Sequence, residues 1–176
     1  MSSRNVLALL CGCQFLLSAS EAGAKVAPTS FVRLAESSDL IVLAKVDSVT
    51  GKPSDPGRRA KATVTEVWKG PKVATVEFHA SSTWTCDITD AKPGETVLLF
   101  LSKGKGAGWV LNASGRGRMP LRTVDGKTYV TPFADVILPP GTPAIAAPPG
   151  SAGGFERAVE LDAARDLVKA ATGAEK

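Results

Sequence analysis

The strongest constraint on the fold of this chain is a series of short β-strand patterns separated by turns rich in glycine and proline. In residues 60–68 small apolar side chains alternate with lysine and threonine, and residues 73–80 alternate around Val76 and Phe78. A period of two predicts strands with one buried face. Residues 96–102 are apolar on both faces, which predicts a central strand.

Further segments extend this pattern. Residues 40–49 and 109–111 are rich in branched or aromatic side chains, and Asp125-Gly126 is a strong hairpin signal between residues 121–124 and 128–133. Few segments have helical periodicity. The pattern predicts a mainly β fold, a small closed or nearly closed antiparallel barrel.

Two helices are expected beside the strands. Ser30 is a suitable N-cap for a short helix that buries Phe31 and Leu34. Near the other end, Phe155, Val159, Ala163 and Leu167 recur every four residues, which predicts a C-terminal helix over residues 155–176. Residues 139–154, rich in proline and glycine, are expected to link it to a barrel domain of residues 25–138 without joining a sheet.

Residues 1–24 have the order of a secretory signal peptide. Arg4 precedes an apolar run over residues 6–17, and Ala22 and Ala24 supply small residues for cleavage before Lys25. We therefore expect an exported protein, periplasmic or secreted. An alternative is a lipid anchor on Cys13, because residues 10–13 read Leu-Cys-Gly-Cys.

The cysteines do not provide a disulfide framework. The chain has three, and Cys11 and Cys13 lie within the predicted signal peptide. Cys86 would then be a lone thiol, either buried or paired between two chains. We expect burial, with Trp84, Cys86 and Ile88 on one inward strand face.

The common enzyme signatures do not occur. His79 is the single histidine, and neither a HExxH motif, paired cysteines at metal-binding spacing nor a G-x-S-x-G elbow is present. No catalytic, cofactor-binding or metal-binding residue is therefore assigned. Paired carboxylates for a hydrolase remain an alternative, and the candidates are Glu66, Glu77, Asp87, Asp90 and Glu95.

Basic side chains gather in two places. Arg58 and Arg59 lie in a turn segment, and Arg116 and Arg118 follow the strand at 109–111. With Cys86 they are the candidate interaction residues, and solvated turns are the competing interpretation. The net charge of +4 is compatible with an anionic partner, and export argues against nucleic acid.

Several motifs together resemble those of bacterial exported proteins of the netrin-like class, which are similar to the inhibitory domain of tissue inhibitors of metalloproteinases. The resemblance rests on residues 30–31, 37–42, 64–70, Cys86 and 93–101, within residues 29–120. The most distinctive parts are Val-Trp-Lys-Gly and Gly-Glu-x-x-Leu-Leu-Phe. The resemblance implies a five-stranded OB-type barrel with flanking helices.

The resemblance also implies metalloprotease inhibition, but this chain departs from the family at the site of that activity. The inhibitors begin with Cys-x-Cys, whose terminal amine and carbonyl chelate the protease zinc, whereas residues 25–27 here are Lys-Val-Ala. Cys86 stands where a partner cysteine of the family would be. We therefore expect a non-enzymatic exported module that binds a protein or a glycan, with an inhibitor and a carboxylate-dependent hydrolase as alternatives.

Overall fold

The computed structural model describes residues 27–52, 55, 57–80, 91–105, 108–151 and 154–173. Its elements are β1 (Thr29–Ser30), α1 (Phe31–Ser37), β2 (Leu40–Thr50), β3 (Arg59–Lys69), β4 (Thr75–His79), β5 (Thr96–Lys103), β6 (Trp109–Leu111), β7 (Arg118–Val124), β8 (Lys127–Val130), β9 (Val136–Ile137), β10 (Ala144–Ala146), β11 (Arg157–Glu160) and α2 (Leu161–Thr172). The predicted signal peptide, residues 1–24, lies outside the described residues.

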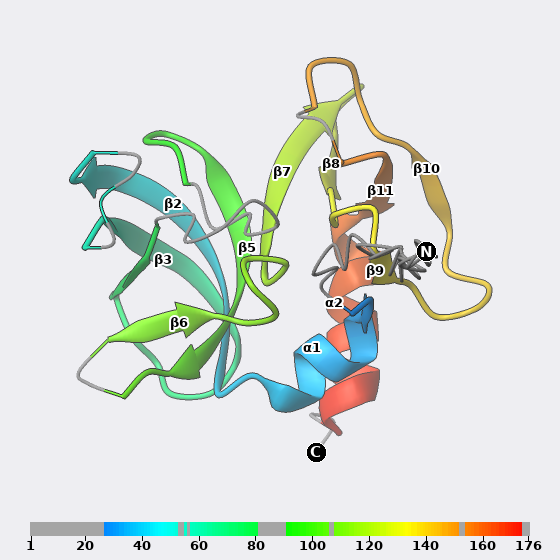
Figure 1. Ribbon diagram of the computed structural model, residues 1–176. Coiled ribbons are helices and arrows are strands. Elements are labelled where there is room, and N and C mark those ends of the chain that lie inside the picture. Colours follow the sequence, from blue (N-terminus) through cyan, green and yellow to red (C-terminus); the bar gives the residue numbers. More distant parts are fainter. Residues whose placement is uncertain are drawn as a thin grey trace, which may run out of the picture.

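Five of the described strands close into a barrel, seen on the left of Figure 1. The barrel order is β2-β3-β4-β6-β5, and β5 pairs back to β2. The pairs are antiparallel except for β4 and β6, which run parallel where Phe78 meets Trp109. When the five barrel strands are numbered in the order in which they occur in the chain, their pairing order is that of an OB-type barrel. The predicted mainly β fold, with an OB-type barrel, a short N-terminal helix and a C-terminal helix, is confirmed.

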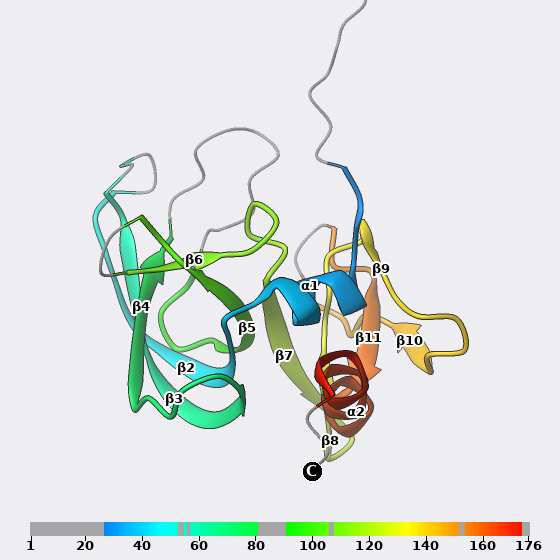
Figure 2. The same cartoon turned by 90° about the horizontal axis from the view of Figure 1, so that it is seen from below.

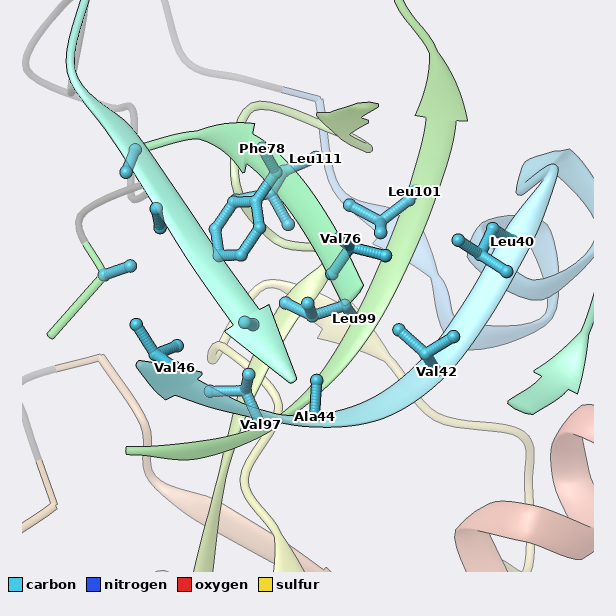
Figure 3. Close-up of a cluster of buried hydrophobic side chains, with 14 residues drawn as sticks. Leu40, Val42, Ala44, Val46, Val76, Phe78, Val97, Leu99, Leu101 and Leu111 are labelled. Carbon is cyan, nitrogen blue, oxygen red and sulfur yellow. The ribbon is translucent and has the colours of Figure 1, made fainter. Parts of the chain in front are cut away.

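The barrel interior is filled by inward side chains from all five strands. Figure 3 shows Leu40, Val42, Phe78, Leu99 and Leu101 pointing toward one another inside it. All five of these residues are 0% exposed. The small residues of β3 lie in the same cluster, so the wall of the barrel can approach the bulky side chains closely.

A second core lies outside the barrel, against β2 and β5. Because side chains alternate along a strand, Leu98 and Phe100 of β5 point away from the barrel interior and into this core. There Phe31 of α1 meets Phe100 edge to face, with ring centroids 5.3 Å apart. This explains why residues 96–102 are apolar on both faces: the strand separates two cores.

The strands after the barrel form a sheet that extends the second core away from the barrel. β7 pairs with β5, and the hairpin of β7 and β8 turns at Asp125-Gly126 as predicted. β11 then pairs with β8, and β10 with β11, so one nine-stranded sheet runs from the barrel to this edge. In Figure 2, α2 lies beside β8, and α1 lies beside α2.

Two predictions about the C-terminal third are wrong. Residues 144–146 join a sheet as β10, because the prolines of this segment flank these three residues and the strand lies at the sheet edge. The last helix begins at Leu161, because residues 157–160 extend as β11 and pair with β8. The buried residues of α2 are therefore Ala164 and Val168, one position beyond the predicted stripe.

The short helix α1 is fixed at both ends. Its N-cap Ser30 accepts a hydrogen bond from the Arg33 backbone N–H at 3.0 Å, as predicted. At the other end Lys69 Nζ donates to the carbonyl oxygens of Ala35 and Glu36, at 2.9 and 2.8 Å. These contacts satisfy terminal backbone groups that a short helix leaves open. No helix in the described part of the chain is long and apolar enough to span a bilayer.

Candidate functional site

The structure places the predicted interaction residues in two separate regions. Arg58 and Arg59 lie at the start of β3, at one end of the barrel. Arg116 and Arg118 lie at the start of β7, where the chain leaves the barrel for the second sheet. Cys86 lies outside the described residues, so its predicted burial stays a prediction.

Arg58 and Arg59 bring three segments together at their end of the barrel. Arg58 Nη1 donates to the Ala80 carbonyl oxygen at 3.4 Å, which connects the start of β3 to the end of β4. Arg59 pairs in register with His79. The Arg59 guanidinium lies beside Gly108, where an added Cβ would come within 3.2 Å of Nη1. Ala80 and Gly108 therefore border the same cationic end.

The outward side chains of β3 and β4 form a polar surface, called here the β3–β4 face. It consists of Arg59, Lys61, Thr63, Thr75, Glu77 and His79. Lys61 lies opposite Glu77, and Thr63 opposite Thr75. All but Arg59 and His79 are exposed, and those two are half-buried. Because alternate residues fill the barrel, this face is the outer side of a rigid wall.

Arg116 is an internal residue of the fold. It is 4% exposed, and its Nε and Nη2 donate to the Asp135 carboxylate at 3.0 and 2.7 Å. Its guanidinium carbon lies 5.3 Å from the centroid of the Phe133 ring. Arg116 therefore contacts the segment before β9 within the protein.

Arg118 has a similar internal position. It is 7% exposed, and its Nη1 donates to the two carboxylate oxygens of Glu95 at 3.1 and 2.9 Å. Its guanidinium lies 6.0 Å from the Phe155 ring, which in turn meets Phe133 edge to face at 5.3 Å. The two arginines thus flank a pair of aromatic rings where the barrel joins the second sheet.

The carboxylates considered for a hydrolase are dispersed. Glu66 is held by Arg165, Glu95 by Arg118, and Glu77 lies opposite Lys61. Asp87 and Asp90 lie outside the described residues. Among the side chains that the structure describes, no group of three or more histidine, cysteine or carboxylate residues is placed to hold a metal ion.

The Glu66 carboxyl group has a shifted pKa. Partial burial acts to raise its pKa, and the hydrogen bonds and charge of Arg165 outweigh that effect, so the pKa lies below its usual value. Both hydrogen bonds from Arg165 are 3.1 Å long, and Arg165 also stacks on Trp68 at 5.2 Å. The contact connects α2 to β3. No sequence pattern predicted this contact, because the spacing around Arg165 indicates an ordinary solvent-facing helix residue.

Residues Asn112-Ala113-Ser114 match the Asn-X-Ser pattern of N-glycosylation, and the Asn112 side chain takes part in the fold. Asn112 Nδ2 donates to Ser38 Oγ at 2.8 Å, and its Oδ1 accepts from Ser102 Oγ at 2.5 Å. Both polar atoms of the amide are thus engaged where α1 approaches β5. This geometry favours a structural role for the asparagine.

Comparisons with known proteins add no family to this description: no family model and no curated protein matches the chain. The fold and the polar strand surface define an OB-type barrel with an attached sheet and two helices. The netrin-like resemblance stays a prediction.

Proposed function

We propose that this protein is a non-enzymatic exported binding module whose β3–β4 face binds an acidic glycan. The observation that carries the proposal is the set of exposed polar side chains on that face, Lys61, Thr63 and Thr75 beside Glu77, next to the half-buried Arg58 and Arg59. In OB-type barrels the outer face of the second and third strands, with the neighbouring loops, commonly binds oligosaccharides or oligonucleotides. β3 and β4 occupy these two positions.

The polar character of the face favours a glycan over a protein partner. Protein interfaces have an apolar core, usually with aromatic or other large side chains. Among the described residues, the exposed large apolar side chains are Val110, Ile137 and Ile145, which lie on β6, β9 and β10. A sugar chain with carboxylate or sulfate groups matches lysine, arginine and threonine side chains on a flat strand surface.

The proposal is tested with residues 25–176 and three probes: a uronic acid oligosaccharide, a sulfated oligosaccharide, and neutral dextran. The test variant is Arg59→Gln with Lys61→Gln. The control is Lys72→Gln with Lys127→Gln, which removes the same charge from exposed positions outside this face. Calorimetric titration at fixed ionic strength gives the affinities.

We expect the acidic oligosaccharides to bind and dextran not to bind. The test variant should lose affinity about tenfold, which corresponds to roughly 1.4 kcal/mol, and the control less than about twofold. Equal losses in both variants would mean that binding follows net charge alone. Full binding by the test variant would place the ligand elsewhere on the protein.

A further inference from the structure

A small cavity lies between the barrel and the second sheet, away from the β3–β4 face. Its volume is about 50 Å³. It is lined by the segment before β5, by β7, by the residue after β8, and by Ser151 and Phe155. This location makes the cavity a joint feature of both parts of the fold.

Four of the eight described residues that line this cavity are charged. Lys92, Arg118 and Arg122 contribute three cations, and Glu95 contributes one carboxylate. Glu95 is already engaged, because it accepts hydrogen bonds from Arg118 Nη1 and from the Lys92 backbone N–H. Arg118 is 7% exposed and Thr131 is 1% exposed, so part of the wall is deeply buried.

Lys92 and Arg122 have no ion-pair partner among the described residues, and Arg122 Nη1 donates one hydrogen bond, to the Leu121 carbonyl oxygen at 3.3 Å. Neither residue forms an ion pair with a described carboxylate, whereas Arg118 is compensated by Glu95. Lys92 is exposed and Arg122 half-buried, so one cation lies nearer the solvent than the other. Two cations beside a cavity from which water is partly excluded attract an anion more strongly than they would in open solvent.

We propose that this cavity, called here the oxyanion pocket, binds a single carboxylate, sulfate or phosphate group. A volume of about 50 Å³ holds a group of a few heavy atoms, since a cavity of about 10–15 Å³ already holds one water. A larger ligand would place only its charged group inside. Arginine and lysine supply the N–H donors that such groups accept.

Two other features of the surface give weaker support for a binding site. The groove at Trp68, Lys69 and Thr172 has a volume of about 320 Å³, but Lys69 already binds the carbonyl oxygens at the end of α1. The edge strand β10 presents Ile145, and nothing in the structure shows what would cover it. Among the described residues, those of the oxyanion pocket combine a cavity, the buried Arg118 and two cations that form no ion pair.

The experiment titrates the protein with sodium sulfate, sodium phosphate and sodium acetate at constant ionic strength, with chloride as the reference. Backbone amide NMR shifts at Arg122 and Thr131 report the location, and the shift in melting temperature reports the stabilisation. A uronic acid disaccharide and a sulfated disaccharide form the second arm. Tighter binding of a disaccharide than of its free anion would show that the anionic group is carried on a sugar.

The variants are Arg122→Gln and Lys92→Gln, with Lys127→Gln as the control. We expect each pocket variant to weaken sulfate binding by about tenfold, and the control by less than about twofold. Because Lys92 is exposed, its variant keeps the test valid if the Arg122 variant fails to fold. NMR and melting-temperature shifts that are no larger with sulfate than with chloride would overturn the proposal. Unchanged sulfate affinity in both pocket variants would also overturn it.

The same titration separates this proposal from the proposed glycan function. The variant with Arg59→Gln and Lys61→Gln should keep its sulfate affinity, because the oxyanion pocket includes neither residue. Loss of sulfate binding in that variant would mean that sulfate binds at the β3–β4 face. That outcome would overturn the oxyanion pocket and leave the glycan proposal standing.

Discussion

Arg165 of α2 donates two parallel hydrogen bonds to the Glu66 carboxylate of β3, from Nε to Oε1 and from Nη2 to Oε2. The two residues are 99 positions apart in the chain. Arg165 also pairs with Asp162 one turn earlier and lies over the Trp68 ring. The last helix is thus attached to the barrel by charge and stacking as well as by its apolar face.

This attachment should make stability depend on pH. Because the folded-state pKa of Glu66 lies below its usual value, the ion pair stabilises the protein above the unfolded-state pKa, and this contribution is lost as the pH falls through the folded-state pKa. The pair is partly exposed, so we expect Glu66→Gln to cost only about 0.5 kcal/mol at neutral pH. The cost should disappear in acid.

Urea unfolding at about pH 7 and about pH 3 measures this difference. Glu36→Gln, on the exposed side of α1, is the control. A cost for Glu66→Gln that is the same at both pH values would show that the ionised pair contributes nothing.

Gly154 should tolerate no side chain. Its φ is +85°, and an added Cβ would overlap the Phe133 ring. Gly94 has a similar φ of +83° but open space around it. We expect Gly154→Ala to cost at least about 2 kcal/mol, and Gly94→Ala only about 1 kcal/mol from the backbone alone. Equal losses in denaturant unfolding would contradict the predicted steric overlap.

Removal of only Asp135 from the Arg116–Asp135 ion pair should lower the free energy of unfolding. Asp135→Ala would leave the Arg116 guanidinium, whose side chain is 5% exposed, without its carboxylate. We expect a loss of about 3 kcal/mol, and a smaller one when Arg116→Met accompanies Asp135→Leu. Lys127→Gln, which breaks an exposed pair with Glu160, should cost less than about 0.5 kcal/mol. Thermal unfolding compares the variants; a double variant worse than Asp135→Ala would refute the argument.

A mature chain that begins at Lys25 should not inhibit zinc proteases by chelation. The first described pairing is that of Thr29 with Val136 in the β1–β9 sheet, and the preceding Ala27 and Pro28 are exposed. A rigid terminal amine is needed for chelation, and chain ends fray unless they are held. Assays against a panel of zinc endopeptidases, repeated with one residue added at the N-terminus, test this. Tight inhibition that disappears on extension would prove the prediction wrong.

Much of the barrel, and some features outside it, could be predicted from local patterns. The alternation in β3 and β4, the doubly apolar β5, the Ser30 cap and the Asp125-Gly126 turn depend on a few neighbouring residues, and each was predicted correctly. β10 and β11 were not predicted, because β11 forms by pairing with β8, a strand distant in sequence, and β10 forms by pairing with β11. Strand pairing thus overrode the helical pattern in residues 157–160.

The candidate sites divide in the same way. The sequence by itself determined which cations and carboxylates the chain carries, and where the strands place them relative to a buried face. Only the tertiary structure decided that Arg116 and Arg118 are committed to Asp135 and Glu95, while Lys92 and Arg122 border a cavity. The reason is physical: a charge is neutralised by whichever opposite charge the fold brings within a few ångströms, and sequence spacing does not contain that distance.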